Sequence, residues 1–436
     1  MSNAFTTGLA DALTAATKRF VARTPASAAA LARARHVMPG GNTRSSLWSA
    51  PHPLSIVAGA GCRITDADGH EYVDYLGEFT AGIFGHTAPA LAQVMAEAHL
   101  GGIGLSSQTP FETEFAERLV RRFPSIDLIR FTNSGTEANL MAVTAARLVT
   151  GRDRVAVFKG GYHGGVLTFG SGNAPVNVPF DFVVLPYNDI AAAEAEFAAN
   201  GRRIAAVLVE PMQGAGGCIA AAPDFLLRLR ALTHAHGALL IFDEVQTARM
   251  AFGGAQARLG ITPDMTTLGK IFGGGLAFGA FGGTAEVMQR FDPARPDALQ
   301  HAGTFNNNRL TMMTGAAATD LYLTAEALDA LFAQGEKFRK DLNALFAGRG
   351  HLFQVTGMGS IMNIHGKGGS EQDRAGRLRL LHLLMLERGC YFASRGLIAL
   401  SFPIGEAETD RFLAAVDAAL KESNAFPSVA AVRPAS

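Results

Sequence analysis

The sequence contains few cysteines and has no excess of either charge, and each shortage argues against a class of protein. Only three cysteines occur among 436 residues, at Cys62, Cys218 and Cys390, and none forms a C-x-x-C pair with another. We therefore expect no disulfide framework, no zinc knuckle and no other metal site, and a reducing compartment. Lysine and arginine total 38, as do aspartate and glutamate. This balance gives no electrostatic reason to expect a nucleic acid as partner.

Long apolar runs are also missing. No segment approaches the roughly 20 consecutive apolar residues that a membrane-spanning helix needs. The first twenty residues, "MSNAFTTGLADALTAATKRF", lack the basic start and apolar core of a signal peptide. We therefore predict a cytoplasmic protein that does not interact with membranes.

The chain is long enough for two domains, since 48% of its residues are hydrophobic and 17% are charged. From about residue 89, helical stretches alternate with short apolar runs, namely "LIRFTN", "RVAVFKG", "FDFVVLPY", "IAAVLVEP" and "GALLIFDEV". This alternation predicts an α/β fold with an open, mostly parallel sheet. We expect a helical arm and loop over residues 1–60, a large domain over 61–320 and a smaller α+β domain over 321–436. The N-terminal segment would belong to the smaller domain.

Polar residues follow four of these runs. "LIRF" leads into "TNSGTEAN", "RVAVF" into "KGGYHGG", "AAVLV" into "EPMQG" and "ALLIF" into "DEVQ". Open α/β sheets bind ligands beyond the carboxyl ends of their strands, so we expect these segments to meet at one edge.

Each segment taken alone has a purely structural interpretation as well. Asp243 or Glu244 could cap a turn, and Ser134 or Thr136 could be the N-cap of a helix. Alternatively, the helix start could bind a phosphate through its N–H groups. Tyr162 could belong to an ordinary loop, or it could stack on a flat ligand that the flanking glycines let approach.

Lys270 decides between these interpretations. It is the single charged residue of "TLGKIFGGGLAFGAFGG", residues 267–283, and the other six lysines lie in polar, helical or strand-end surroundings. We expect this lysine to be buried and to act as a nucleophilic amine. A lysine, an acid at a strand end, a stacking aromatic ring and a phosphate-binding turn together indicate pyridoxal phosphate. The acid would keep the ring nitrogen of that cofactor protonated.

Motifs for other nucleotides and reactions are absent. The glycine run near Lys270 breaks the G-x-G-x-x-G spacing because Phe278 occupies its third position. The sequence has no G-x-x-x-x-G-K-[ST], H-E-x-x-H or G-x-S-x-G motif, which argues against P-loop, zincin and α/β-hydrolase chemistry.

The motifs "NSGTEAN", "GGYHGG", "VEPMQG", "FDEV", "TLGK" and "GTFNNN" occur in this order. In order and spacing they resemble the class III pyridoxal-phosphate aminotransferases of fold type I, over nearly the whole chain. "MPGGNTRS" is similar to the corresponding segment of both the glutamate-1-semialdehyde 2,1-aminomutases and the β-amino acid (β-phenylalanine) aminotransferases. The run from "RFTNSGTEANLMA" to "LPYND" most resembles the second group.

The resemblance implies a role for each matching residue. Lys270 would form the imine with the cofactor, and Asp243 would pair with the pyridine nitrogen. The remaining cofactor residues would be Ser134, Gly135 and Thr136 at the phosphate, Tyr162 and Val245 on the two ring faces, Glu210 in support, and Thr304 reaching the phosphate of a neighbouring subunit. The working unit would then be a homodimer with shared active sites.

Two arginines favour a transaminase over a mutase. Arg44 would bind the carboxylate of the amino donor. Arg395, in "GCYFASRGLIALS", would bind the keto-acid acceptor, although a surface position is the alternative for this residue. Glu78, in "GEFTAG", is included as a substrate residue without a physical argument for its role.

We therefore predict a ping-pong transaminase that moves an amino group from a β-amino acid, preferably aromatic, to 2-oxoglutarate or pyruvate. The alternatives are an isomerase similar to glutamate-1-semialdehyde aminomutase and an amine:pyruvate ω-transaminase. A protein that binds the cofactor without turnover, as a sensor would, is a third alternative.

Overall fold

The computed structural model describes residues 2–348, 353–422 and 426. The chain divides into two compact units. The first unit is formed from residues 1–88 and 333–436, and the second unit is Pro89–Phe332.

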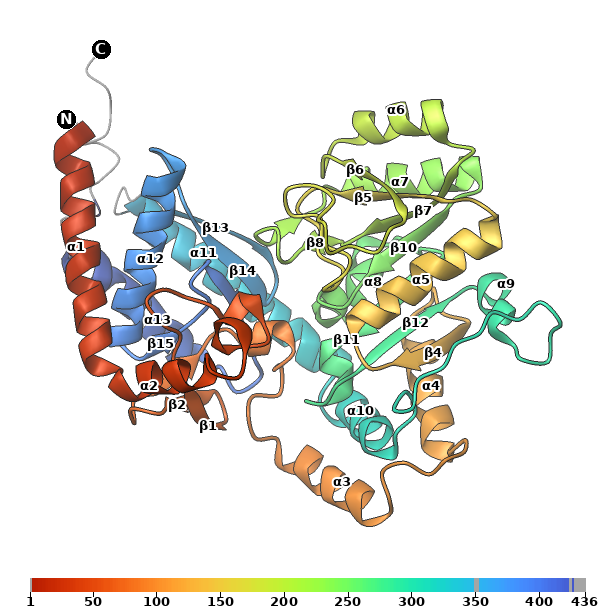
Figure 1. The fold of residues 1–436 in the computed structure, drawn as a ribbon, viewed down its shortest axis with the longest axis horizontal. Helices are drawn as coiled ribbons and strands as arrows, with labels where there is room; N and C mark the ends of the chain where they lie inside the picture. The colour runs from red at the N-terminus through yellow and green to blue at the C-terminus, as the bar shows by residue number, and fades with distance from the viewer. Residues whose placement is uncertain (1, 349–352, 423–425, 427–436) are drawn as a thin grey trace. The chain divides into compact units, whose positions relative to one another are not determined.

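A seven-stranded sheet is the centre of the second unit (Figure 1). Its order is β4-β12-β11-β10-β7-β5-β6, and β12 alone among these strands runs against its neighbours. The strands are β4 (Leu128–Thr132), β5 (Arg154–Phe158), β6 (Asp181–Leu185), β7 (Ile204–Val209), β10 (Leu239–Asp243), β11 (Met265–Gly269) and β12 (Gly279–Gly283). The predicted mostly parallel sheet is confirmed.

Helices cover both faces of this sheet, which explains why its strands read as continuous apolar runs. Alternate residues of β5, β7 and β10 pack against α5 (Gly135–Thr150) on one face. The intervening residues pack against α6 (Ile190–Asn200) and α7 (Pro223–His236) on the other. The remaining elements of this unit are α3 (Pro89–Leu100), α4 (Pro110–Arg122), α8 (Gly254–Leu259), α9 (Ala285–Met288), α10 (Arg309–Leu321), the short strands β8 (Met212–Gln213) and β9 (Ile219–Ala220), and the 3₁₀ turns η4 (Thr247–Met250), η5 (Lys270–Gly273) and η6 (Gln289–Phe291).

The first unit has two small sheets and five helices over its described residues. The sheets are β1-β2-β3-β15 and β13-β14-β16. Their strands are β1 (Ile56–Ala60), β2 (Arg63–Asp66), β3 (Glu71–Asp74), β13 (Phe353–Met358), β14 (Ile361–Gly366), β15 (Cys390–Tyr391) and β16 (Leu397–Ala399). The helices are α1 (Ser2–Arg23), α2 (Pro25–Ala34), α11 (Ala325–Gly348), α12 (Glu371–Glu387) and α13 (Glu406–Glu422). The first residues of α11 belong to the second unit. The 3₁₀ turns of the first unit are η1 (Pro39–Gly41), η2 (Ser45–Leu47) and η3 (Glu78–Thr80).

The pairing of β3 with β15 determines where the units divide. Cys390 pairs with Val73 and Tyr391 with Asp74 in a parallel register. Residues 61–88 therefore pack with the C-terminal segment, whereas the sequence analysis places this stretch in the large domain. The second division falls inside α11, about two turns of helix after its start, instead of before the helix.

Two classes of feature are missing from the part of the chain that the structure describes. No helix there is long and apolar enough to span a bilayer. Nor do the same residues bring together three or more histidine, cysteine, aspartate or glutamate side chains that could hold a metal ion.

Candidate active site

The predicted cofactor residues follow strands that end at one edge of the large sheet. β12 runs antiparallel to both β4 and β11, so those two strands point the same way as the parallel strands β10, β7 and β5. The strand ends are followed by Ser134 after β4, Tyr162 after β5, Glu210 after β7 and Lys270 after β11, and Asp243 is the last residue of β10.

Ser134 begins α5 as its N-cap. Its Oγ accepts the N–H of Glu137 at 3.2 Å, and Glu137 in turn accepts the N–H of Asn133 at 2.6 Å. The N–H groups of Gly135 and Thr136 have no acceptor among the described residues. A helix start with unpaired N–H groups attracts anions. The capping interpretation is therefore correct for Ser134, and it leaves two N–H groups for a phosphate.

The side chain of Val245 lies against two glycines of the site. A Cβ built on Gly135 would be 2.9 Å from each methyl carbon of Val245, and one built on Gly269 would be 3.1 Å from the nearer methyl. Real Cβ atoms do not approach as closely as the first distance, so a side chain at Gly135 would displace Val245, and one at Gly269 would be tightly packed against it. Val245 thus contacts both the start of α5 and the residue before Lys270.

Asp243 is 4% exposed, and both of its carboxylate oxygens accept hydrogen bonds. Oδ2 accepts the side-chain amide of Asn139 at 2.8 Å and lies 2.8 Å from Nδ1 of His163. Oδ1 accepts the N–H of Val245 at 3.0 Å. A buried carboxylate is costly without such partners. The arrangement fixes the orientation of the carboxylate.

Asn139 and His163 are not among the site residues predicted from the sequence. Asn139 also donates to the backbone oxygen of His163 at 3.1 Å, and its own oxygen accepts the hydroxyl of Thr267 at 2.6 Å. The sequence signal for Asn139 is a polar residue on a helix face otherwise lined with alanine and valine, one turn after Gly135. A buried amide on such a face needs polar partners.

Glu210 is fully enclosed beside this network. Its two oxygens accept the N–H groups of Tyr162 and Gly214, each at 3.1 Å. Burial and the nearby charge of Asp243 raise the pKa of Glu210 to about 7, while His163 opposes the shift. The side chain holds the Tyr162 loop against the end of β7, which agrees with a supporting position.

Lys270 begins η5 directly after β11 and has φ of 50°. A left-handed backbone is unfavourable for a residue with a side chain and occurs preferentially at functional sites. The lysine is half-buried, so the expectation of a buried lysine is wrong. Ile271 and Phe272, which follow it in η5, are buried.

Tyr162 and Thr304 are both exposed. The Tyr162 side chain, which lies next to the Glu210 contact, is 42% exposed, so part of its ring faces away from the protein interior. Thr304 lies in a turn before α10. Asn306, two residues later, accepts the side-chain amide of Asn133 at 2.9 Å, which ties this turn to the start of α5.

Glu244 points into a different environment from Asp243. Its carboxylate is fully buried and accepts the N–H groups of Ala255 and Gln256, at 2.9 and 2.8 Å, and the hydroxyl of Thr247 at 2.7 Å. Burial raises the pKa of this carboxyl. Of the two adjacent acids, Glu244 caps α8 and Asp243 belongs to the candidate site.

The predicted substrate residues lie in the first unit. Arg44 forms an ion pair with Glu78, and its guanidinium lies 5.1 Å from the ring centre of Phe79. The guanidinium of Arg395 is 6.0 Å from the same ring. The structure therefore brings Arg44, Glu78 and Arg395 together around one aromatic side chain.

The segment that carries Glu78 has an unusual backbone. Glu78, Phe79 and Thr80 have φ of 47°, 51° and 81°. Three consecutive left-handed residues with side chains are strained, and strain of this kind collects at ligand sites. Asp74 stabilises the preceding turn by accepting the N–H groups of Leu76 and Gly77.

These donor groups fit pyridoxal phosphate. The start of α5 offers two N–H groups for a phosphate, and the buried Asp243 carboxylate suits a protonated ring nitrogen. Gly164 lets the loop after β5 lie directly against the start of α5, since a Cβ at Gly164 would be 2.4 Å from the hydroxyl of Thr136. The fold and this set of groups define a fold type I pyridoxal-phosphate transferase.

Comparison with known proteins gives the family. The family model "Aminotransferase class-III" matches residues 45–419. The chain belongs to the class III aminotransferases and is a pyridoxal-phosphate-dependent enzyme acting on small amino and keto substrates. It is 50% identical over 413 residues to a β-phenylalanine transaminase of Variovorax paradoxus, covering 93% of this chain and 95% of that protein.

Two further comparisons agree with this family. A crystal structure of a β-phenylalanine aminotransferase from Variovorax paradoxus matches with a TM-score of 0.93 and 48% identity, over 96% of this chain and 99% of that one. A glutamate-1-semialdehyde 2,1-aminomutase of Sorangium cellulosum is 40% identical over 425 residues, covering 91% of this chain and 97% of that protein.

Proposed function

We propose that the protein is a β-amino acid transaminase that transfers the amino group of an aromatic β-amino acid to an α-keto acid, 2-oxoglutarate or pyruvate, in two successive half-reactions. The observation that carries this proposal is the pair of arginines around Phe79, since two carboxylated substrates need two cationic groups. The 50% identity to a β-phenylalanine transaminase supports the same donor class. We also infer a cytoplasmic location, supported by three buried cysteines without disulfides.

The residues of the second unit would perform the chemistry. Pyridoxal phosphate, when bound, supplies an aldehyde that accepts the amino group and a ring that withdraws electrons from the reacting carbon. The α5 start would bind its phosphate, and Asp243 would hold a proton on its ring nitrogen. The Nζ amine of Lys270 would take the proton from the substrate carbon as general base. His163 and Asn139 would keep the Asp243 carboxylate oriented.

The residues of the first unit would select the substrates. Arg44 would bind the carboxylate of the β-amino acid, and Glu78 would occupy that guanidinium until the substrate carboxylate replaces it. Arg395 would bind the keto-acid acceptor. Because both guanidinium groups pack against Phe79, this ring would keep the two cations in place.

Arginine variants separate these two roles. We expect Arg44→Ala to raise the KM for β-phenylalanine by about 30- to 1,000-fold, because a charge-assisted pair to the carboxylate is lost. Its effect on 1-phenylethylamine, a donor without a carboxylate, should be much smaller. Arg395→Ala should spare the first half-reaction and slow reaction of the aminated enzyme with 2-oxoglutarate or pyruvate. Cofactor absorbance follows each half-reaction separately.

Arg33→Ala, which changes an exposed arginine of α2, is the matched control and should leave both half-reactions unchanged. If Arg44→Ala and Arg395→Ala impair only the donor half, or if neither impairs either half, the assignment of the two arginines is wrong.

An aminomutase is the second candidate, favoured by the 40% identity to a glutamate-1-semialdehyde aminomutase. One panel of donors distinguishes the candidates: β-phenylalanine, an α-amino acid, 1-phenylethylamine and glutamate-1-semialdehyde, each followed by cofactor absorbance. A transaminase needs an added keto acid for turnover, whereas a mutase isomerises glutamate-1-semialdehyde without one.

Fast reaction of 1-phenylethylamine with pyruvate, and no reaction of β-phenylalanine, would indicate an amine:pyruvate ω-transaminase. Binding of the cofactor with no response to any donor would indicate a sensor.

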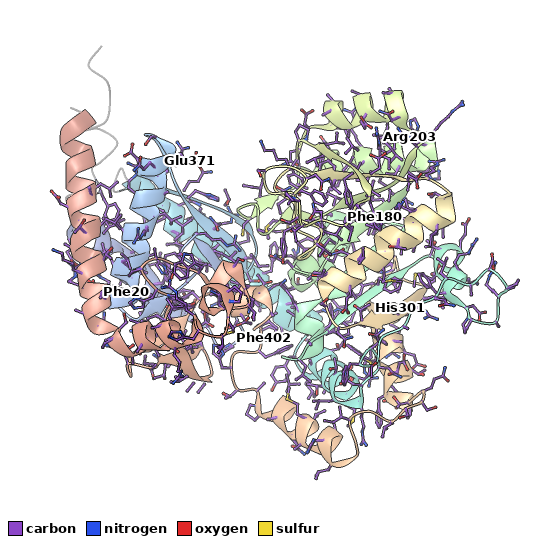
Figure 2. All side chains as sticks on the ribbon, in the orientation of Figure 1. Phe20, Phe180, Arg203, His301, Glu371 and Phe402 are labelled. Atoms are coloured by element: carbon purple, nitrogen blue, oxygen red, sulfur yellow. The ribbon has the colours of Figure 1, made fainter. Side chains whose placement is uncertain are left out.

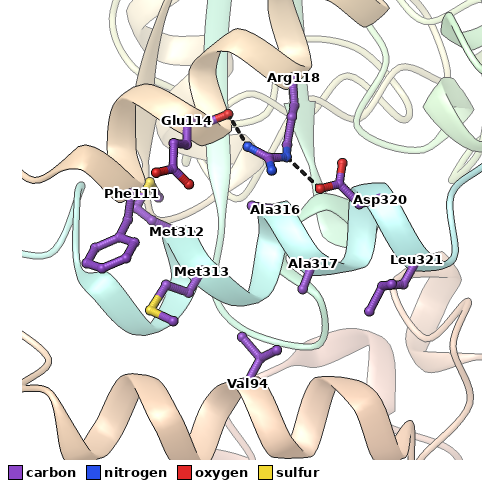
Figure 3. A pocket seen from close by; sticks show the side chains of 10 residues that line it. All are labelled: Val94, Phe111, Glu114, Arg118, Met312, Met313, Ala316, Ala317, Asp320 and Leu321. Carbon is purple, nitrogen blue, oxygen red and sulfur yellow. Dashed lines mark hydrogen bonds and ion pairs between the residues drawn. The ribbon is translucent and has the colours of Figure 1, made fainter.

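The working unit would be a homodimer. An apolar groove between α3, α4 and α10 supports this (Figure 3). It is lined by Val94, Phe111, Met312, Met313, Ala316, Ala317 and Leu321, with Glu114 and the Arg118–Asp320 ion pair among them. Leu321 of this lining is 57% exposed, and Leu100, the last residue of α3, is 86% exposed. Large exposed apolar side chains beside such a groove are typical of protein interfaces.

Thr304→Ala tests whether the dimer completes the cofactor site. If Thr304 reaches the phosphate of the neighbouring subunit, this variant should release pyridoxal phosphate faster on dialysis while remaining dimeric in sedimentation. Ala317→Arg should split the dimer and weaken cofactor retention more strongly, because it places a charge in the groove. Thr14→Ala, in the exposed part of α1, is the control. A fully active monomer would contradict the proposal.

A further inference from the structure

The first unit contains a cavity whose lining includes none of the residues assigned to the cofactor or to the substrates. It has a volume of about 250 Å³ and lies between α1, the loop after η2 and α12. Its lining consists of Phe20, Trp48, Ser49, Ala50, Arg379, His382, Leu383, Leu386 and Ser394. Phe20 is labelled in Figure 2 and comes from α1.

Two nitrogen-bearing side chains of this cavity have unused hydrogen-bonding capacity. His382 is 7% exposed, and its Nδ1 has no hydrogen-bond partner. The Nε of Arg379 is also buried without a partner. The one hydrogen bond of the Arg379 side chain is a long one of 3.5 Å to the backbone oxygen of Ala50. Buried polar atoms without partners are costly, so a ligand that supplies acceptors would stabilise this arrangement.

The charge of the cavity favours an anion. Arg379 is the one cationic group of the lining, because burial and the neighbouring Arg379 lower the pKa of His382 to about 4 and keep its ring neutral at pH 7. No carboxylate contributes to the lining. The guanidinium and the neutral ring, with the hydroxyls of Ser49 and Ser394, form a donor set that suits one carboxylate group.

The rest of the wall is apolar. Phe20, Trp48, Leu383 and Leu386 contribute two aromatic rings and two leucines. An apolar cavity of about 150 Å³ is known to accept benzene, and sites for drug-sized ligands begin at about 300 Å³. A volume of 250 Å³ therefore suits a ligand with a single ring.

We propose that this cavity is a binding site for a small monocarboxylate that carries an aromatic or other apolar group. The carboxylate binds Arg379 and His382, and the apolar group lies among Phe20, Trp48 and Leu386. The cavity shares Ser49, Ser394 and three other residues with the neighbouring cavity that contains Arg395 and Phe79. A ligand here would thus contact the residue directly before Arg395.

Titration of the holoenzyme with 3-phenylpropanoate tests the site. Trp48 is the single tryptophan of the sequence, so its fluorescence reports on the cavity, and calorimetry gives the affinity. We expect saturable binding with a change in Trp48 emission that persists in the Arg44→Met/Arg395→Met variant, because the proposed donor site would bind the same acid in the unaltered enzyme. In that variant we expect one molecule per chain and at least tenfold weaker binding of the neutral 3-phenylpropanamide. Absence of saturable binding of the acid below about 10 mM would overturn the proposal.

Variants locate the bound molecule. In the Arg44→Met/Arg395→Met background, Arg379→Met should weaken 3-phenylpropanoate binding at least tenfold, whereas Arg374→Met, which changes an exposed arginine of the same helix, should not. The Arg44→Met/Arg395→Met double variant should still bind, because those arginines do not line this cavity. If Arg379→Met does not fold, Arg379→Gln replaces it with the same expected result.

Binding that disappears in the Arg44→Met/Arg395→Met variant, or that in this background survives loss of the Arg379 charge, would overturn the proposed site. The outcome is distinguishable from that of the proposed transaminase function, since this background lacks the two arginines of that function and keeps the whole lining of the cavity.

Discussion

Replacing Lys270 by alanine is expected to reduce transamination by at least about 10³-fold, because one side chain supplies both the amine that holds the cofactor and the general base. The variant should still bind pyridoxal phosphate through the α5 start and Asp243, with an absorbance spectrum that resembles the free aldehyde. The measurements are the rate of β-phenylalanine turnover and the cofactor spectrum before and after addition of the donor.

The matched control for this variant is Lys159→Ala. Lys159 follows β5 at the same edge of the sheet, but its side chain is exposed and its backbone oxygen accepts the side chain of Gln213. We expect nearly full activity from this control. If Lys270→Ala retains a tenth of the original rate, or if Lys159→Ala is the inactive variant, Lys270 is not the catalytic lysine.

Much of the cofactor site could be predicted from the sequence because parallel strands covered by helices on both faces have a recognisable sequence pattern. Each strand is a short apolar run, and the polar residue that ends it must lie at one edge of the sheet. This rule predicts a shared edge for Ser134, Tyr162, Glu210 and Asp243, whereas Lys270 was identified as the single charged residue of an apolar, glycine-rich segment. The family resemblance supplied the roles of these residues, which the variants proposed here would test.

Contacts between elements were harder to predict. The Asn139 amide reaches Asp243 because of the rotation of α5 about its axis, and the local sequence does not determine that rotation. Glu244 differs from Asp243 only in that β10 has ended, so its carboxylate turns to α8. The units divide at different residues from those expected because β15 adds to the sheet of β3 across more than 300 residues of chain. Each of these outcomes depends on partners distant in sequence.

Asp243→Asn is expected to have the second largest effect, a loss of several orders of magnitude in kcat with a normally folded protein. The amide has the same shape, and its oxygen can still accept the hydrogen bond of Asn139, but it carries no negative charge to keep a proton on the ring nitrogen. His163→Asn removes a partner of the carboxylate and not the charge itself, so it should lower kcat less and shift the pH profile of the donor half-reaction. The kinetics of each half-reaction and the cofactor spectrum as a function of pH give these quantities.

Glu244→Gln distinguishes the two adjacent acids. Glu244 caps α8 through three protein donors and takes no part in the Asp243 network, so the variant should melt at a lower temperature yet keep nearly the original kcat. The reverse result, a stable but inactive Glu244→Gln beside an active Asp243→Asn, would move the ring-nitrogen role to Glu244. It would also mean that the Asn139–His163–Asp243 contacts support the fold of β10 and α5 instead of the reaction.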